Sequence, residues 1–496
     1  MIFRQGLVAL LAFCPFSAAW AVPASDEGAA RLKGVFQTYF GAVEGVVSVT
    51  PQGDSYELRI DPAPLLAQVP DDQAQITVSP LTYELTDNGD GSWGVSEDQV
   101  LSWSVAVPKM FEQKGSTRIE STGTWDEALM SFRDQKAVMT DYVIDSVQYG
   151  PPMAADGAPA DPSAEPQVIS RDHQSTARME TALTGTAGKA GGVDQAMSFT
   201  ATDLAQRQEV AMGPGGAPML IEVSAPGYGG QAQIAGARTD GILSMLAWFV
   251  AHPSQELIKG SQEGLRDKLA AAMPLWDDLS MDMDMRDLKV VSPVGTFGLA
   301  SAKIGIGMSG ATPDGRFQER FTLSGLTVPE GVLPPWAAPI LPQEVTLDFA
   351  ASHFDLAAPA KLLIETFDLN ADDPLAKLSP EQVQQALLPD GKAALKLAPS
   401  QIKGDGYQID YRGDMAVGPG AAPVGSALIE ATGLDKVEAA LAAAPQEQAA
   451  QPLMMLRMAR AMSKPDGSGG NSWDIQMAET GVVTVNGQPM GPATPQ

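Results

Sequence analysis

Apolar and polar residues alternate along much of this 496-residue chain, and that pattern predicts β-strands. A clear example is the run from Leu101 to Val107, in which Trp103 and Val105 are separated by single small or polar residues. Since residues two apart share one face of a strand, each such run offers one apolar face. Similar runs lie at 46–49, 56–60, 76–78, 81–85, 179–183, 197–202, 219–223, 279–285 and 297–308.

Apolar residues at three- and four-residue steps predict helices in a smaller part of the chain. In the first such segment, Leu32, Phe36 and Tyr39 form one stripe after Ser25 or Asp26, either of which can cap the helix. The expected helices lie near 26–40, 240–272, 379–388 and 434–463. Sheets should therefore cover more of the chain than helices.

Four segments share one order of elements: a strand, a polar break, an amphipathic helix and a return strand. They begin near Tyr56, Gln233, His353 and Ala427. Their spacing is irregular, so we interpret them as degenerate duplications, with chance similarity as the alternative. The predicted fold class is α+β, mostly β, with large twisted antiparallel sheets and helix pairs packed on them.

Length and composition indicate more than one domain. A chain of 496 residues exceeds the usual size of a single core, and 49 glycines with 38 prolines favour many short strands and turns. The expected regions are a signal peptide at 1–21, an N-terminal β-rich domain with a leading helix at 22–149, a Pro/Ala/Asp-rich linker or loop at 150–170, a middle α+β repeat region at 171–329, and a C-terminal α+β repeat region at 330–496.

The first residues have the three parts of a secretory signal peptide. Arg4 precedes an apolar run from Leu7 to Phe16, and Ala19-Trp20-Ala21 forms a cleavage site ahead of Val22. Cleavage near Ala21-Val22 removes Cys14, the sole cysteine, and predicts a periplasmic protein without disulfides. Lipidation of Cys14 is the alternative, although the bulky Phe13 precedes the cysteine. The apolar run of the signal peptide is too short to span a bilayer. No transmembrane segment is expected in the mature chain.

The C-terminal segment Glu479-Thr480-Gly481-Val482-Val483-Thr484-Val485-Asn486-Gly487, the exported N-terminus and the Ala/Gly/Pro-rich β-repeats carry a family resemblance. Together they resemble a group of alphaproteobacterial periplasmic proteins that share a domain of unknown function, and more distantly the AsmA-like envelope proteins. The resemblance implies an envelope role and covers most of the mature chain. The AsmA-like group usually keeps an N-terminal membrane anchor, whereas this chain has a cleavable signal.

A formal charge of −28 excludes some partners. Such an acidic surface repels nucleic acid and anionic headgroups, so no nucleic-acid partner is expected. The charge itself is interpreted as adaptation to a salty medium or as a surface for a cationic partner.

Motifs for metal binding and catalysis are weak, so no cofactor and no catalytic residue is expected. His173, His252 and His353 are not at metal-ligand spacing, and the chain has no phosphate loop or dinucleotide fingerprint. Many acidic pairs are present, but nothing in the sequence selects two carboxylates that face one cleft.

Two segments look like metal sites but have simpler interpretations. The segment 87–91, Asp-Asn-Gly-Asp-Gly, resembles a calcium loop, yet glycine occupies a ligand position and a tight hairpin turn is favoured. Met281, Met283 and Met285 share one face of a strand and could bind copper(I), but a strand with its methionines in the core needs no metal.

The candidate partner- or membrane-facing residues are Met454, Arg457, Met458, Arg460 and Lys464. As a helix after Pro452, this segment places basic residues on one side and methionines on another. Flexible methionines suit adaptable apolar surfaces, and basic amphipathic helices lie on membranes. In the alternative interpretation, the helix packs on its own sheet and its arginines pair with acidic residues.

From these observations we expect an exported periplasmic binding or scaffold protein without enzymatic activity. It would hold a lipid or other apolar ligand in a sheet groove, or bind an envelope protein. The alternative is a hydrolase of envelope polymers that uses acidic residues.

Overall fold

The computed structural model describes residues 23–67, 70, 72–150, 165–212, 217–466 and 469–492. The expected signal peptide, Cys14 and most of the expected linker at 150–170 lie outside these residues. The chain forms two compact units, the first made of 1–277 with 368–374 and the second of 278–367 with 375–496. We call them unit 1 and unit 2.

Unit 1 is built on an antiparallel sheet in which β2 pairs with β1 and β4, and β4 is followed by β5 to β10 in chain order. β3 pairs with the far end of β5, beyond β4. The strands are β1 (Val47–Gln52), β2 (Ser55–Ile60), β3 (Gln75–Val78), β4 (Leu81–Asp87), β5 (Ser92–Val107), β6 (Phe111–Asp126), β7 (Ser131–Gly150), β8 (Gln167–Ala187), β9 (Val193–Val210) and β10 (Met219–Ala237).

The core of unit 1 lies beneath helix α2 (Asp26–Phe40). Ser25 caps this helix by accepting a hydrogen bond from the Gly28 amide at 3.0 Å. Leu32 and Phe36, on its inner face, are 0% and 1% exposed and pack among apolar residues of β1, β2, β4 and β5. The first strands and the first helix therefore close on one another as a buried core.

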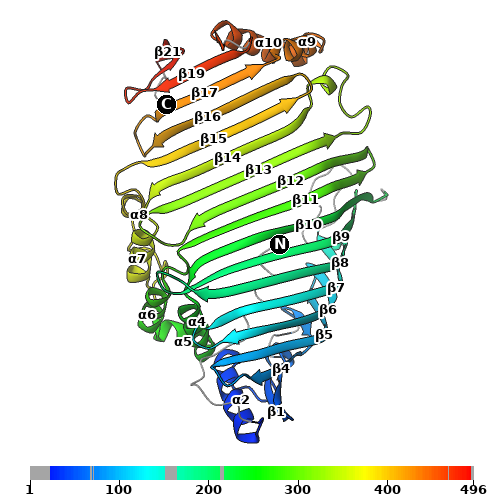
Figure 1. Cartoon of the computed structure of the whole chain (residues 1–496), viewed down its shortest axis with the longest axis vertical. Helices are drawn as coiled ribbons and strands as arrows, with labels where there is room; N and C mark the ends of the chain where they lie inside the picture. The colour runs from blue at the N-terminus through cyan, green and yellow to red at the C-terminus, as the bar shows by residue number, and fades with distance from the viewer. Residues whose placement is uncertain are drawn as a thin grey trace. The chain divides into compact units, whose positions relative to one another are not determined.

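Unit 2 is an antiparallel sheet in which β11 to β17 pair in chain order, followed by β19, β20 and β21 (Figure 1). The short β18 pairs with β19. The strands are β11 (Asp278–Ser292), β12 (Gly295–Ser309), β13 (Gly315–Thr327), β14 (Pro342–Phe354), β15 (Ala393–Gly404), β16 (Tyr407–Val417), β17 (Val424–Thr432), β18 (Lys464–Pro465), β19 (Asn471–Met477), β20 (Val482–Val485) and β21 (Gln488–Pro492).

The remaining helices occur singly or in groups, and each group follows a strand. In four places a strand leads into a helix: β2 into α3, β10 into α4, β14 into α7 and β17 into α9. Unit 1 contains α3 (Ala63–Leu66), α4 (Thr239–Ala251), α5 (Gln255–Gly260) and α6 (Gln262–Ala272), and unit 2 contains η2 (Ala338–Ile340), α7 (Ala357–Thr366), α8 (Pro380–Leu387), α9 (Leu434–Ala442) and α10 (Gln446–Ala461). Within the described residues, no helix is both long and apolar enough to cross a membrane.

Each sheet contains a row of neighbouring positions in which two residues have the left-handed backbone conformation, and we call this row a crease. In unit 1, Asp141 and Asp203 have φ of 53° and 56° and lie in one row, two strands apart. In unit 2, Asp287 and Gly325 have φ of 50° and 67° and are likewise two strands apart in one row. Aspartate and glycine tolerate this conformation better than most residues. The crease also shifts the alternation of side chains by one residue, since the apolar residues of β11 are odd-numbered from Leu279 to Met285, whereas the less exposed positions after Asp287 are even-numbered.

These elements confirm the predicted mostly β fold, with strands covering more of the chain than helices. The four expected helical segments are present as α2, as α4 to α6, as α8, and as α9 with α10. The expectation that the last helix begins after Pro452 is wrong, because α10 begins at Gln446 and contains that proline. The units divide at Asp277, and the expected regions at 22–149, 171–329 and 330–496 stay predictions.

Candidate functional site

The sheet of unit 2 has one apolar face, which follows from how its strands are aligned. Side chains directly opposite one another in paired strands share a face. One such row crosses β11 to β17 and consists of Met285, Ala302, Leu323, Val345, Ile402, Ile409 and Ala431. The adjacent row on β11 to β14 consists of Met283, Ile304, Phe321 and Leu347.

Two further rows extend the same face. One consists of Met281, Ile306, Glu319, Phe349, Leu397, Gly413 and Ala427. The other consists of Leu279, Met308, Phe317, Ala351, Leu395, Met415 and Gly425. We call the surface formed by these four rows the open face.

Solvent reaches nearly all of the open face. From β11 to β16 none of its apolar side chains in the four rows is buried, and Ile304 is 38% exposed. The sheet crosses six strand spacings between β11 and β17, or about 29 Å at about 4.8 Å each. That width exceeds the length of an acyl chain in one bilayer leaflet, which is about 15 Å. The open face is thus wide enough for apolar chains to lie on it.

The opposite face of the same strands is polar, and several of its side chains pair with one another. The Arg320 guanidinium contacts the Asp348 carboxylate at 2.8 Å, and Arg412 contacts Glu430 at 3.7 Å. The Gln401 amide donates a hydrogen bond to Asp410 at 2.9 Å. The two faces therefore differ sharply in chemistry, although alternate residues of the same strands form both.

Helices close the open face at the end of unit 2. Leu456 and Ala459 of α10, with Met462 directly after the helix, pack against a buried cluster that contains Trp473, whose indole N–H donates to the Ala459 carbonyl at 2.7 Å. Leu434 of α9 belongs to the same cluster. The apolar side of α10 is therefore used within the fold, and the accessible part of the face lies on the preceding strands.

The expected partner-facing residues divide into two groups. Arg457 and Arg460 pair with Glu438 at 2.8 and 2.5 Å, and Arg460 also pairs with Asp435 at 2.6 Å. These hydrogen bonds from Arg457 and then Arg460 hold the pKa of Glu438 below the ordinary value of a glutamate. The arginines thus make the internal pairs of the alternative interpretation.

The methionines of the same helix point to solvent. Met454, Met455 and Met458 are 62%, 55% and 55% exposed, and Lys464 on β18 is exposed as well. The structure brings Lys464 into β18, apart from the paired arginines. A role of these residues toward a membrane or partner stays a prediction.

The methionines of β11 were expected in a buried core, and that interpretation is wrong. Met281, Met283 and Met285 are only partly buried members of the open face, opposite Ile306, Ile304 and Ala302. Alternation alone identified the face of the strand but could not show whether another layer covers it. Copper binding by these thioethers stays a prediction.

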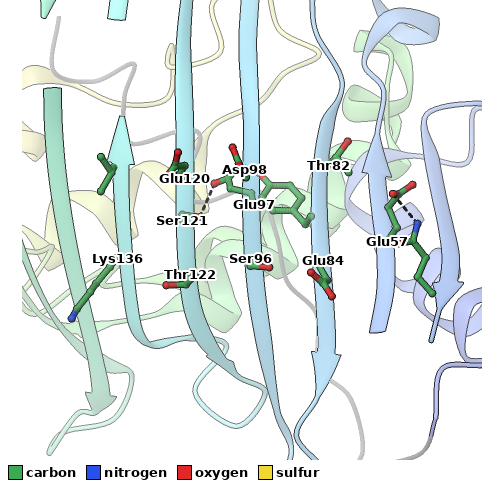
Figure 2. A pocket seen from close by; sticks show the side chains of 13 residues that line it. Glu57, Thr82, Glu84, Ser96, Glu97, Asp98, Glu120, Ser121, Thr122 and Lys136 are labelled. Carbon is green, nitrogen blue, oxygen red and sulfur yellow. Dashed lines mark hydrogen bonds between the residues drawn. The ribbon is translucent and has the colours of Figure 1, made fainter. Parts of the chain in front are cut away.

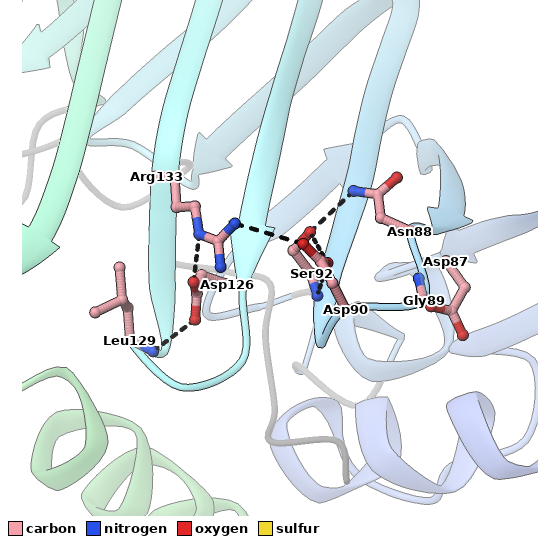
Figure 3. A network of polar contacts seen from close by, with 8 residues as sticks. All are labelled: Asp87, Asn88, Gly89, Asp90, Ser92, Asp126, Leu129 and Arg133. Atoms are coloured by element: carbon pink, nitrogen blue, oxygen red, sulfur yellow. Dashed lines mark hydrogen bonds and ion pairs between the residues drawn. The ribbon is translucent and has the colours of Figure 1, made fainter. Parts of the chain in front are cut away.

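The segment 87–91 forms the predicted turn between β4 and β5, and Figure 3 shows the polar contacts that hold it. The Asp90 carboxylate accepts hydrogen bonds from the Ser92 hydroxyl at 2.6 Å and its amide at 3.0 Å, and these lower the pKa of Asp90. Arg133 pairs with Asp90 at 3.7 Å and contacts Asp126, which ties this turn to the one between β6 and β7. Asp87 accepts from the Gly89 amide at 2.8 Å.

Among the described residues no group of three or more His, Cys, Asp or Glu side chains is placed to hold a metal ion. The histidines lie apart and have local partners. His173 contacts Asp145 at 2.8 Å, His252 contacts the Trp248 carbonyl at 2.7 Å, and His353 contacts Ser352 at 3.0 Å.

A second candidate is a hollow of about 640 Å³ in unit 1, lined by residues of β1, β2 and β4 to β7 (Figure 2). Burial raises the pKa of Glu97, although the Gln99 amide at 2.7 Å and the Ser121 hydroxyl at 2.8 Å donate hydrogen bonds to its carboxylate. Burial, and then Glu97, raise the pKa of the neighbouring Tyr83. The sequence had not singled out this carboxylate, because its burial depends on three strands meeting.

Asp98 and Glu120, two other carboxylates of the hollow, do not form a pair with Glu97. Asp98 follows Glu97 on the strand and so faces the other side of the sheet. There Arg118 contacts both Asp98, at 2.5 Å, and Glu120, at 3.0 Å. A hydrolytic acid and base would need two carboxylates that face one bond.

Comparisons with protein-family models, with curated proteins and with solved structures each give no match to this chain. The resemblance to periplasmic and AsmA-like proteins stays a prediction.

Proposed function

We propose that this chain is an exported periplasmic protein that binds a lipid, or another amphiphile with long apolar chains, on the open face of unit 2. The observation that supports this is the accessible apolar surface formed by aligned residues of β11 to β17. Each methylene transferred from water to such a surface contributes about 0.8 kcal/mol. Binding of this kind needs no cofactor and no reacting group.

The exposed methionines of α10 fit the same proposal as a contact point with a lipid surface or an envelope protein. They lie on the outer side of a helix whose inner side packs at the end of the open face. The exposed positions from 448 to 461 are uncharged except for Arg457, which is paired with Glu438. A neutral surface on such an acidic chain avoids repulsion by anionic headgroups.

Two expectations about the fold belong to this proposal. We interpret the four strand-to-helix segments as degenerate duplications, which would produce a long sheet from copies of one unit. Helix pairs would then pack on the sheet and leave the intervening strands accessible. Export is supported by residues 1–21, and N-terminal sequencing of the exported protein should find Val22 first.

The test is lipid content after purification from the native envelope. Organic extraction followed by mass spectrometry should recover lipid in near-stoichiometric amounts from the wild-type protein. Ile304→Glu places a charge in the open face between Met283 and Phe321, and we expect it to reduce bound lipid at least about tenfold.

The matched control is Lys303→Glu, on the polar face of the same strand and adjacent in sequence. It changes the net charge by more than Ile304→Glu does, yet it should retain bound lipid. Equal lipid in the two variants, or none in the wild type, would contradict binding on the open face.

The hydrolase alternative is supported by one observation, the buried Glu97 with its raised pKa. Under that alternative, wild-type protein would release soluble fragments from peptidoglycan and Glu97→Gln would not. We favour lipid binding because the neighbouring Asp98 and Glu120 are turned to the other face of the sheet and paired with Arg118.

A further inference from the structure

Glu319 is the single charged residue in the four rows of the open face. It lies on β13, opposite Ile306 of β12 and Phe349 of β14. Its side chain is exposed, and no hydrogen bond or ion pair of its carboxylate is found among the described residues. Its two neighbours on the polar face are paired, since Gln318 donates a hydrogen bond to Asp348 and Arg320 forms an ion pair with the same carboxylate.

Three phenylalanines surround this carboxylate. Phe317 and Phe321 stand two residues away on the same strand and face, and Phe349 is directly opposite. All three are partly buried. The chain has 15 phenylalanines and 6% aromatic residues, so this concentration around one acid is a local feature.

A carboxylate on an apolar face loses its contact with water when an apolar ligand covers it. Burying an unpaired charge is costly, so an acyl chain laid across Glu319 would be disfavoured unless the ligand supplied a positive group. An ammonium satisfies the carboxylate, and aromatic rings attract the same cation through their π-faces. The combination of one acid and three aromatic rings therefore favours a cationic headgroup over a neutral or anionic one.

We propose that Glu319, with Phe317, Phe321 and Phe349, forms a headgroup subsite for an ammonium carried by an apolar chain. This inference rests on the proposed function, because it selects among amphiphiles that bind the open face. The ligand class is a lipid or other amphiphile with an amine or quaternary ammonium group. The adjacent rows of apolar residues would hold its chains.

The experiment compares three detergents with the same dodecyl tail, below their micelle concentrations, by isothermal titration calorimetry on the full chain. Dodecyltrimethylammonium should bind about tenfold more tightly than dodecyl maltoside, a difference of about 1.4 kcal/mol. Dodecyl sulfate should bind more weakly than either. Tetramethylammonium, which lacks the tail, should bind far more weakly than dodecyltrimethylammonium and so separates headgroup from chain.

Glu319→Gln should remove the preference for the ammonium detergent while leaving the affinity for dodecyl maltoside unchanged. Phe349→Leu should reduce that preference in part, since it removes a ring but keeps an apolar side chain. The control Glu344→Gln removes one negative charge from the polar face of β14 and should leave the preference intact. This control measures how much the acidity of the whole chain attracts any cation.

The outcomes separate the two proposals. If all three detergents bind alike and Glu319→Gln changes nothing, the headgroup subsite is wrong while the open face still binds apolar chains. If Glu344→Gln lowers the preference as much as Glu319→Gln, the attraction is general and the subsite is again wrong. If no detergent binds, both the lipid-binding function and the subsite are overturned.

Discussion

Units 1 and 2 use the same antiparallel alternation but do different things with their apolar faces. In unit 1, Leu32, Phe36 and Leu58 are completely or almost completely buried between α2 and the first strands. In unit 2, the apolar side chains of β11 to β16 in the four rows remain partly in solvent, and the buried cluster is confined to the region beneath α9 and α10. An alternating strand therefore indicates an apolar face, but not what covers it.

The polar content of the faces differs as well. In unit 1 the less exposed side of β5 and β6 includes Glu97, Ser121 and Thr117 among apolar residues, and their hydrogen bonds are made within the sheet. In unit 2 the corresponding rows carry Glu319 as the single charge. The first arrangement satisfies its polar groups internally, whereas the second leaves one acid for a ligand.

The largest expected difference between the units is in the cost of removing a phenyl ring. Phe36→Ala should lower the free energy of unfolding by about 3–5 kcal/mol, because it leaves a cavity in a closed core. Phe321→Ala should cost about 1 kcal/mol, since Phe321 is only partly buried on the open face. Urea unfolding monitored by hydrogen exchange in peptides from each unit measures both. Equal costs would mean that the face of unit 2 is covered.

The creases should respond to substitution in the same way in both units. Asp203→Val in unit 1 and Asp287→Val in unit 2 place a β-branched residue at positive φ, which should cost about 1–2 kcal/mol. Asp203→Gly and Asp287→Gly should be close to neutral, because glycine adopts this conformation without strain. Asp282→Val, at an exposed position of the same strand as Asp287, is the control for loss of a carboxylate. Chemical denaturation would contradict the crease if valine and glycine behaved alike.

A smaller, pH-dependent effect is expected at Glu97. Burial raises its pKa in the folded state, so the folded protein takes up a proton before the unfolded chain does as the pH falls. The contribution of Glu97 to stability is therefore full below the unfolded pKa and is lost as the pH rises through the folded pKa. Glu97→Gln should be more stable than wild type at neutral pH, and this difference should shrink toward acidic pH.

Ser121→Ala sharpens the same measurement. The Ser121 hydroxyl donates to Glu97 and favours its charged form, so removing it should raise the pKa of Glu97 further and steepen the pH dependence. Thermal unfolding of the three proteins across a pH series provides the data. A wild-type protein that responds to pH as Glu97→Gln does would show that this carboxylate is not effectively buried.

Local patterns in the sequence determined much of the architecture. Alternation identified the strands at 101–107 and 279–285, three- and four-residue steps identified α2 and α9 with α10, and Asn-Gly and Asp-Gly identified the turn at 87–91. These features depend on neighbours along the chain, which explains why a single sequence was sufficient. The paired arginines of α10 were also foreseen as one of two possibilities.

Register and coverage were decided only by the tertiary structure. The rows that place Glu319 opposite Phe349, and Met283 opposite Ile304, depend on how distant strands align, and one residue of slip would exchange the faces. The left-handed Asp287 produces such a shift within a strand, and alternation alone gave no position for it. Whether an apolar row becomes core or open surface depends on which helix reaches it, as α2 does in unit 1 and α10 does only at the end of unit 2. That is a property of packing between distant segments, and the residues of the row are similar in either case.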